Sequence, residues 1–130
     1  MIRDKDVPKK ISEHIPDFSD VVAKHLSYWG EENQNYNLVS QFFKFTVDLW
    51  NNPALEAADK HARLKHIFDF VEMAIAQGDK EASDLFCIEF VQPVTKEQPY
   101  ATEFLRLMGP ASVRCWEIAQ DWVRKQNRFS

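Results

Sequence analysis

Apolar residues recur at helical spacing across residues 61–93, and this stretch predicts two helices joined at Gln77-Gly78-Asp79. Gly78 is expected to end the first helix in the left-handed conformation, and Asp79 to cap the second. The second helix should end at Gln92-Pro93. The apolar stripe of the first helix comprises Leu64, Ile67, Phe68, Val71, Ala74 and Ile75, widened by Phe70. That of the second comprises Ala82, Leu85, Phe86 and Ile88.

Similar patterns predict further helices over residues 8–14, about 17–29, 36–50, 99–108 and about 111–125. The helix over 36–50 carries two adjoining apolar stripes, so it should contact two neighbours and lie centrally. The last helix should bury the face formed by Ala111, Cys115, Ile118, Ala119 and Trp122. The expected core includes Phe42, Phe45, Ile67, Phe68, Leu85 and Trp122.

Two interpretations are open for residues 53–77. On one continuous helix, Leu55 would project about 180° away from Leu64. A break or kink near Asp59-Lys60 would resolve this conflict, and we expect such a break. The alternative is a single long helix with an exposed Leu55.

No segment shows sustained alternation of apolar and polar residues, so the pattern indicates an all-α fold. The chain has 130 residues, which favours one domain, and 45% of them are hydrophobic, which excludes a disordered chain. The charged residues 1–7 are expected to be frayed. The sequence therefore predicts a single helical domain over residues 1–130, folded as a compact, irregular bundle of five to seven helices.

The net charge is −4, distributed as −3 over residues 1–58, −3 over 59–93 and +2 over 94–130. This distribution lacks the basic footprint of a nucleic-acid-binding protein, and no apolar run is long enough to span a membrane. Cys87 and Cys115 have no metal-binding or disulfide-framework spacing, so Cys115 is expected to be a buried thiol. With no secretory signal visible, we expect a cytoplasmic protein.

Two polar residues fall inside apolar stripes. Glu89 points into the arc set by Ala82, Leu85 and Phe86, and His25 lies within the stripe of the helix over 17–29. A buried carboxylate must be paired, hydrogen-bonded or protonated. Both residues are expected to be buried and structural, and contact between them would satisfy both. A carboxylate of a functional site is the alternative for Glu89, and an earlier helix end that leaves it exposed is a third interpretation.

No catalytic, phosphate-binding or metal-binding signature occurs, and His61 and His66 lie about 140° apart around their helix. We therefore expect no catalytic residues, no metal and no cofactor. Acidic residues do gather on the outer surface of the predicted hairpin and in a second loop, where they could dock a basic partner or be ordinary solvated residues. These candidate partner-binding residues are Asp69, Glu72, Asp79, Glu81, Asp84, Glu31 and Glu32.

The order Ile67-Phe68-Asp69-Phe70-Val71-Glu72, Gly78-Asp79, Ile88-Glu89-Phe90 and Leu107-Met108-Gly109-Pro110 resembles small all-helical bacterial proteins. These proteins look like the immunity proteins that accompany polymorphic and contact-dependent toxins. The resemblance implies a cytoplasmic protein that binds and blocks one toxin domain, possessing no catalysis of its own. The alternatives are a helical enzyme or metal-binding protein that uses Glu72, Glu89 and a histidine, and a structural or regulatory adaptor.

Overall fold

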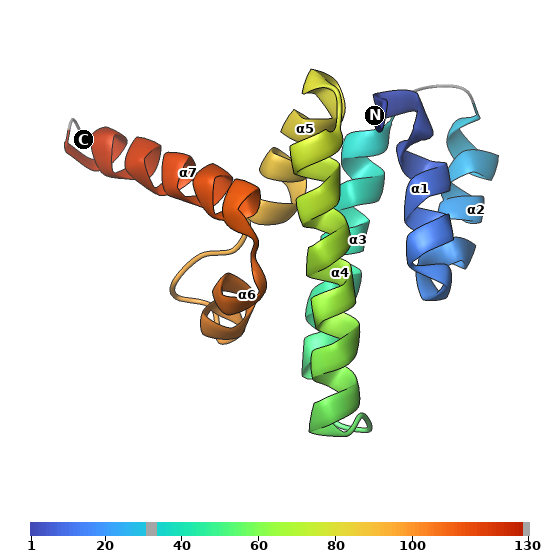
Figure 1. The fold of residues 1–130 in the computed structure, drawn as a ribbon, viewed down its shortest axis with the longest axis horizontal. Helices are drawn as coiled ribbons and strands as arrows, with labels where there is room; N and C mark the ends of the chain where they lie inside the picture. The colour runs from blue at the N-terminus through green and yellow to red at the C-terminus, as the bar shows by residue number, and fades with distance from the viewer. Residues whose placement is uncertain (31–33, 129–130) are drawn as a thin grey trace.

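The computed structural model describes residues 1–30 and 34–128, which form seven α-helices and no β-strand (Figure 1). The helices are α1 (Val7–His14), α2 (Ser19–Trp29), α3 (Asn35–Asn51), α4 (Ala57–Gln77), α5 (Lys80–Phe86), α6 (Ala101–Leu107) and α7 (Pro110–Arg128). Two short 3₁₀ turns, η1 (Asp4–Asp6) and η2 (Pro16–Phe18), flank α1, and a π-helical turn, η3 (Cys87–Val91), extends α5. The predicted all-α bundle of five to seven helices is confirmed.

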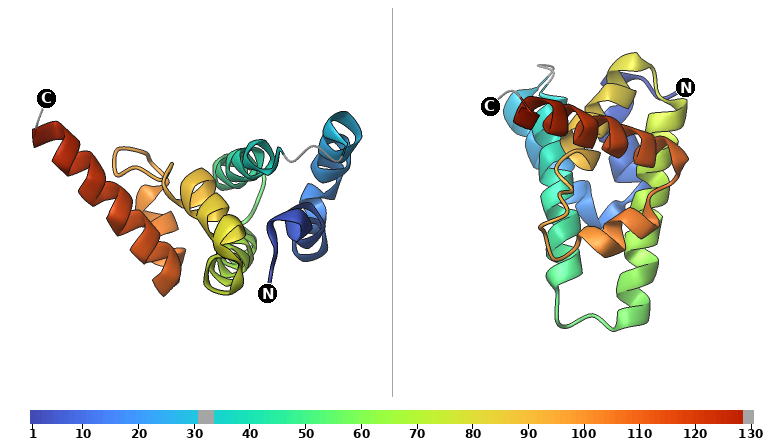
Figure 2. Two further views of the ribbon diagram at one scale, coloured as in Figure 1. Left: turned by 90° about the horizontal axis from the view of Figure 1, so that it is seen from above. Right: turned by 90° about the vertical axis from the view of Figure 1, so that its left-hand side faces the viewer.

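Helices α3 and α4 stand side by side and form the middle of the molecule (Figure 2). Helices α1 and α2 lie on one side of this pair, and α6 and α7 lie on the other. The central position of α3 agrees with its two apolar stripes, since α3 contacts α4, α1 and η3.

Aromatic rings fill the space between these elements. Phe90 of η3 lies 5.3 Å from Phe42 and 5.5 Å from Phe68, measured between ring centroids. Phe68 in turn lies 5.0 Å from Phe104 of α6. All four rings are fully buried, so the predicted hairpin does supply the centre of the core. Tilted and edge-on ring pairs of this kind add about 0.5–1.5 kcal/mol beyond the area that they bury.

Ile2 and Val7 of the first seven residues are buried, so this segment is attached to the body and not frayed as a whole, as had been expected. Ile2 is buried and forms a parallel bridge with Gly78: its N–H donates to the Gln77 carbonyl, and its carbonyl accepts from Asp79 N–H. The amide of Asn35 donates to the Asp4 carbonyl at 2.7 Å. The backbone groups of this segment form hydrogen bonds with distant parts of the chain, and a local charge pattern does not reveal such contacts.

The expected break near Asp59-Lys60 is wrong, because α4 continues through it from Ala57. The conflict between Leu55 and Leu64 is resolved earlier, since Leu55 lies in the turn before the helix and is half-buried there. The expected left-handed conformation of Gly78 is also wrong, because its φ is −75°. Glycine suits this position for a different reason: a Cβ there would collide with the Ala74 carbonyl oxygen.

The core prediction holds for Phe42, Ile67 and Phe68, whereas Phe45 and Leu85 are only partly buried. It is wrong for Trp122, which is 61% exposed. Ile118 is also exposed, because α7 leaves the body after its first turns and projects outward (Figure 1). The predicted buried face of the last helix is therefore covered along its first half only.

Candidate functional site

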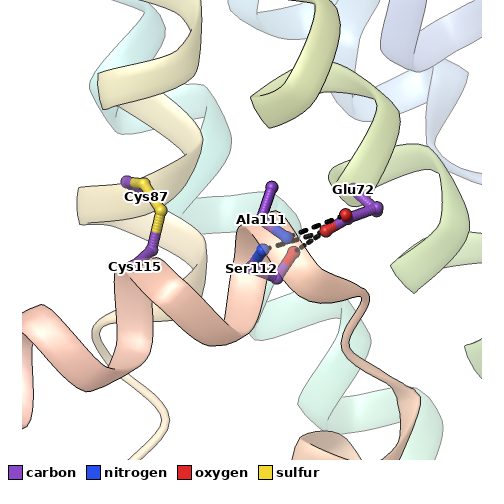
Figure 3. Close-up of a disulfide and its surroundings, with 5 residues drawn as sticks. All are labelled: Glu72, Cys87, Ala111, Ser112 and Cys115. Carbon is purple, nitrogen blue, oxygen red and sulfur yellow. Dashed lines mark hydrogen bonds between the residues drawn. A yellow bond between two sulfur atoms is a disulfide. The ribbon is translucent and has the colours of Figure 1, made fainter.

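Two of the predicted docking acids serve the fold instead. The Glu72 carboxylate accepts hydrogen bonds from the N–H groups of Ala111 and Ser112 and from the Ser112 hydroxyl, each at 2.9 Å (Figure 3). It thus caps the N-terminus of α7, where the helix dipole favours a negative charge. Asp79 caps α5 by accepting from Ala82 N–H at 2.8 Å, as the sequence predicted.

The other acids of the hairpin lie on the surface. Asp69 pairs with Lys65 at 3.0 Å, and Asp84 pairs with Lys80 at 2.7 Å, each one turn apart on its own helix. Exposed pairs of this kind are weak, so these carboxylates remain open to a partner. Glu81 is exposed as well. Glu31 and Glu32 lie outside the described residues.

The expected burial of His25 is confirmed, whereas Glu89 is only half-buried. His25 Nδ1 has no hydrogen-bond partner, and no hydrogen bond joins His25 to Glu89 in the described part of the chain. Burial lowers the pKa of His25 below its usual range. The π-helical turn accounts for Glu89, since its bond from Gln92 N–H to the Cys87 carbonyl spans five residues and shifts the register. The same shift leaves Ile88 exposed.

No group of three or more metal-ligating side chains gathers in residues 1–30 and 34–128. His66 uses Nε2 for a 2.6 Å hydrogen bond with the His14 carbonyl, which ties α4 to the end of α1. The residues of the enzyme alternative belong to different elements: Glu72 lies in α4 and caps α7, Glu89 lies in η3, and the four histidines lie in α1, α2 and α4.

A groove that sequence reasoning missed runs along α3 and α4 below the turn η2. One end is a cleft of about 290 Å³ with an apolar floor of Phe45, Leu49 and Ile67. A second cleft of about 290 Å³ shares Phe45 and Leu49 with the first and extends the groove to Leu55. The visible sequence signal was the stripe containing Phe45 and Leu49, which the body covers only in part. We call this feature the α3–α4 groove.

The rim of the α3–α4 groove carries charge. Asp17 of η2 and Asp48 of α3 contribute carboxylates, and Arg63 of α4 contributes a guanidinium. Arg63 Nη1 lies 3.4 Å from Asp17 Oδ2, and both side chains are more than half exposed, so this contact can open without a large energetic penalty. An apolar floor beside exposed carboxylates favours a ligand that is both apolar and basic.

The base of α7 is held at three points on the other side of the α3–α4 pair. Besides the Glu72 cap, Cys115 forms a disulfide with Cys87 (Figure 3), and the Trp116 indole N–H donates to the Val94 carbonyl at 2.8 Å. The expectation of a buried free thiol at Cys115 is therefore wrong. Sequence spacing could not reveal the pairing, because the two cysteines are 28 residues apart and meet only through the packing of η3 against α7.

Beyond this base, α7 exposes three large apolar side chains, of which Ile118 and Trp122 are neighbours one turn apart. Ile118 is 63% exposed, Trp122 61% and Val123 47%. Exposed apolar residues that adjoin one another mark interaction surfaces more often than isolated ones do. No helix within the described ranges is both long and apolar enough to cross a bilayer.

Comparison with curated proteins and with solved structures gave no match to either. The chain does match one protein family over residues 8–122, a range that includes the α3–α4 groove, the Glu72 cap and both cysteines. Since this match spans most of the chain, the protein belongs to the family described as a domain of unknown function, DUF7674.

Proposed function

We propose that this protein is a binding protein of the immunity type, which blocks a cognate toxin domain by covering part of its surface and performs no reaction itself. The α3–α4 groove is the observation that supports this function best. Its floor of Phe45, Leu49 and Ile67 offers apolar contact area, and its rim offers charge for orientation.

The chemistry of the groove suits a basic, amphipathic segment of the toxin. Apolar side chains of such a segment would lie on Phe45 and Leu49, while its cations would pair with Asp17 and Asp48. Arg63 would give up its contact with Asp17 when a partner cation replaces it. The proposed partner is a protein, whose apolar and basic side chains would fit the groove, and not a nucleic acid.

The exposed acids of the hairpin have a secondary role in this proposal. Asp69, Glu81 and Asp84 add to the net charge of −4 and would attract a basic partner over longer distances. Glu72 and Asp79 are not proposed to attract the partner, because their carboxylates cap α7 and α5.

The test is co-expression with the protein encoded by the neighbouring reading frame, scored by growth of the host and by the dissociation constant of the purified pair. The wild type should restore growth. Leu49→Asp places a charge on the groove floor and should weaken binding about tenfold or more. Asp48→Lys reverses a rim charge without disturbing the core and should slow association, most visibly at low salt.

Matched controls separate these effects from loss of stability. Leu26→Asp makes the same substitution at an exposed leucine of α2, and Asp84→Lys makes the same reversal on α5. Both should bind like the wild type, apart from a small change in association rate for Asp84→Lys. A neighbour that is not toxic, or is not bound, would overturn the immunity function. Equal binding by Asp48→Lys and Asp84→Lys would overturn the groove as its site.

The proposal also places the protein in the cytoplasm. The Cys87–Cys115 disulfide of the structure is more typical of oxidising compartments, because reducing ones hold such pairs as thiols, so the state of this pair in the cell tests the location. Rapid thiol alkylation of freshly lysed cells distinguishes the two. Two alkylated thiols support a cytoplasmic protein, and a protein with none alkylated contradicts it.

A further inference from the structure

The apolar face of α7 continues without interruption from its buried base to its exposed end. Trp122 follows Cys115 by seven residues, which places it about 20° from Cys115 around the helix and about 10 Å further along it. Cys115 contacts the body through its disulfide, but Trp122 is 61% exposed. One face of one helix is therefore half covered by its own chain and half uncovered.

The direction of α7 prevents the body from covering the rest of this face. The Glu72 cap, the disulfide and the Trp116–Val94 hydrogen bond all act on residues 111–116. From there α7 runs away from the other helices (Figure 2). Ile118 and Trp122 lie beyond these contacts, whereas Val123 faces a cleft that it lines with Lys96 and Trp116. A second molecule therefore has to cover Ile118 and Trp122 if they are to be buried.

The order of charges along α7 indicates which second molecule fits. The acids Glu117 and Asp121 precede the bases Arg124 and Lys125. Two copies of this segment in antiparallel orientation place the acids of one beside the bases of the other, whereas parallel copies place like charges together. By the 100° rule, Asp121 and Lys125 flank Trp122 on the same side, where an antiparallel partner would meet them.

We propose that two copies of this chain associate through α7, antiparallel about a twofold axis near Val123. Trp122 of each copy packs across the axis against Trp122 of the other, and Asp121 of each copy pairs with Lys125 of the other in place of its exposed contact with Arg124. Such an isologous contact uses the same patch on both subunits and closes on itself. Residues of η2, α3 and α4 line the α3–α4 groove, next to the end of α1. Helix α7 lies on the other side of the α3–α4 pair from α1 (Figure 1), so the groove stays open in the dimer.

Sedimentation velocity over a wide range of protein concentrations tests this dimer. The wild type should pass from monomer to dimer as its concentration rises. Trp122→Lys should weaken association about thirtyfold or more, the size expected for a buried tryptophan at the centre of an interface. Its melting temperature should stay close to that of the wild type, because Trp122 lies outside the core of the monomer.

Charge exchange tests the antiparallel orientation separately. Asp121→Lys and Lys125→Asp should each weaken the dimer, and the double variant should restore it. Asp84→Lys is the matched control, since it makes the same reversal at an exposed acid of α5, outside α7. A wild type that stays monomeric throughout, or a Trp122→Lys variant that dimerises normally, overturns the proposal. A double variant as weak as the single ones overturns the antiparallel arrangement.

Discussion

The carboxylate of Glu72 links two helices that are far apart in the sequence. Glu72 comes from the middle of α4, yet its partners are the first amides of α7, 39 and 40 residues later. Its position as a polar residue on the edge of an apolar helix was visible in the sequence, and it was interpreted as part of an outer face. This interpretation was wrong because the N–H groups that bond to Glu72 belong to the start of α7. No local sequence pattern connects that helix end with α4.

Replacing Glu72 should therefore destabilise the fold. Glu72→Gln keeps one acceptor oxygen but presents an NH₂ group to backbone donors, and we expect a loss of about 1–3 kcal/mol in the free energy of unfolding. Asp69→Asn on the same helix is the control and should change stability by no more than about 0.5 kcal/mol. Urea melts measure both. Equal midpoints for the two variants would contradict the role of Glu72 as a cap.

His25 should make stability depend on pH. Burial lowers its pKa in the folded state, so the unfolded chain takes up a proton more readily. Stability should consequently fall as the pH drops through the ordinary histidine range near 6.5, by no more than about 1.4 kcal/mol per pH unit. Thermal melts between neutral and mildly acidic pH should show this fall in the wild type. His25→Gln should reduce it, and His61→Gln, at an exposed site on α4, should not.

At the scale of elements, the order and the approximate ends of the helices could be predicted, because caps, prolines and apolar spacing act locally. The errors fall where an element meets a distant one. Gly78 was rightly placed at a helix end, but its backbone is extended because it pairs with Ile2. Ile88 was expected inside and lies outside, because the π-helical turn changes the register that a 100° rule assumes.

The disulfide should contribute strongly to the attachment of α7. The cysteines are 28 residues apart, and a loop of that length corresponds to about 3–4 kcal/mol by the chain-entropy relation. Cys115→Ser should lower the free energy of unfolding by this order. Reduction of the wild type should give the same melt as the variant, because both remove one covalent link. A wild-type melt that is indifferent to reductant would show that the bond is absent in solution.

At the scale of the whole molecule, a central helix pair separates two surfaces with different properties. The α3–α4 groove combines an apolar floor with exposed carboxylates, and α7 presents an apolar row with acids before bases. The all-helical bundle was predictable, because helix periodicity is encoded locally. Neither surface was predictable. Phe45 and Leu49 belong to a stripe that looks like ordinary core. The stripe that ends at Trp122 gives no sign that the other helices do not extend far enough to cover it.

Hydrogen exchange on the complex with the neighbouring gene product tests the binding surface most directly. Amides of residues 45–55 in α3 and the following turn, and of 62–67 in α4, should exchange more slowly when the partner is bound. Amides of α5 around Asp84 should be unchanged. Protection confined to residues 79–84, with the groove segments unaffected, would contradict the account and return the binding site to the acidic hairpin.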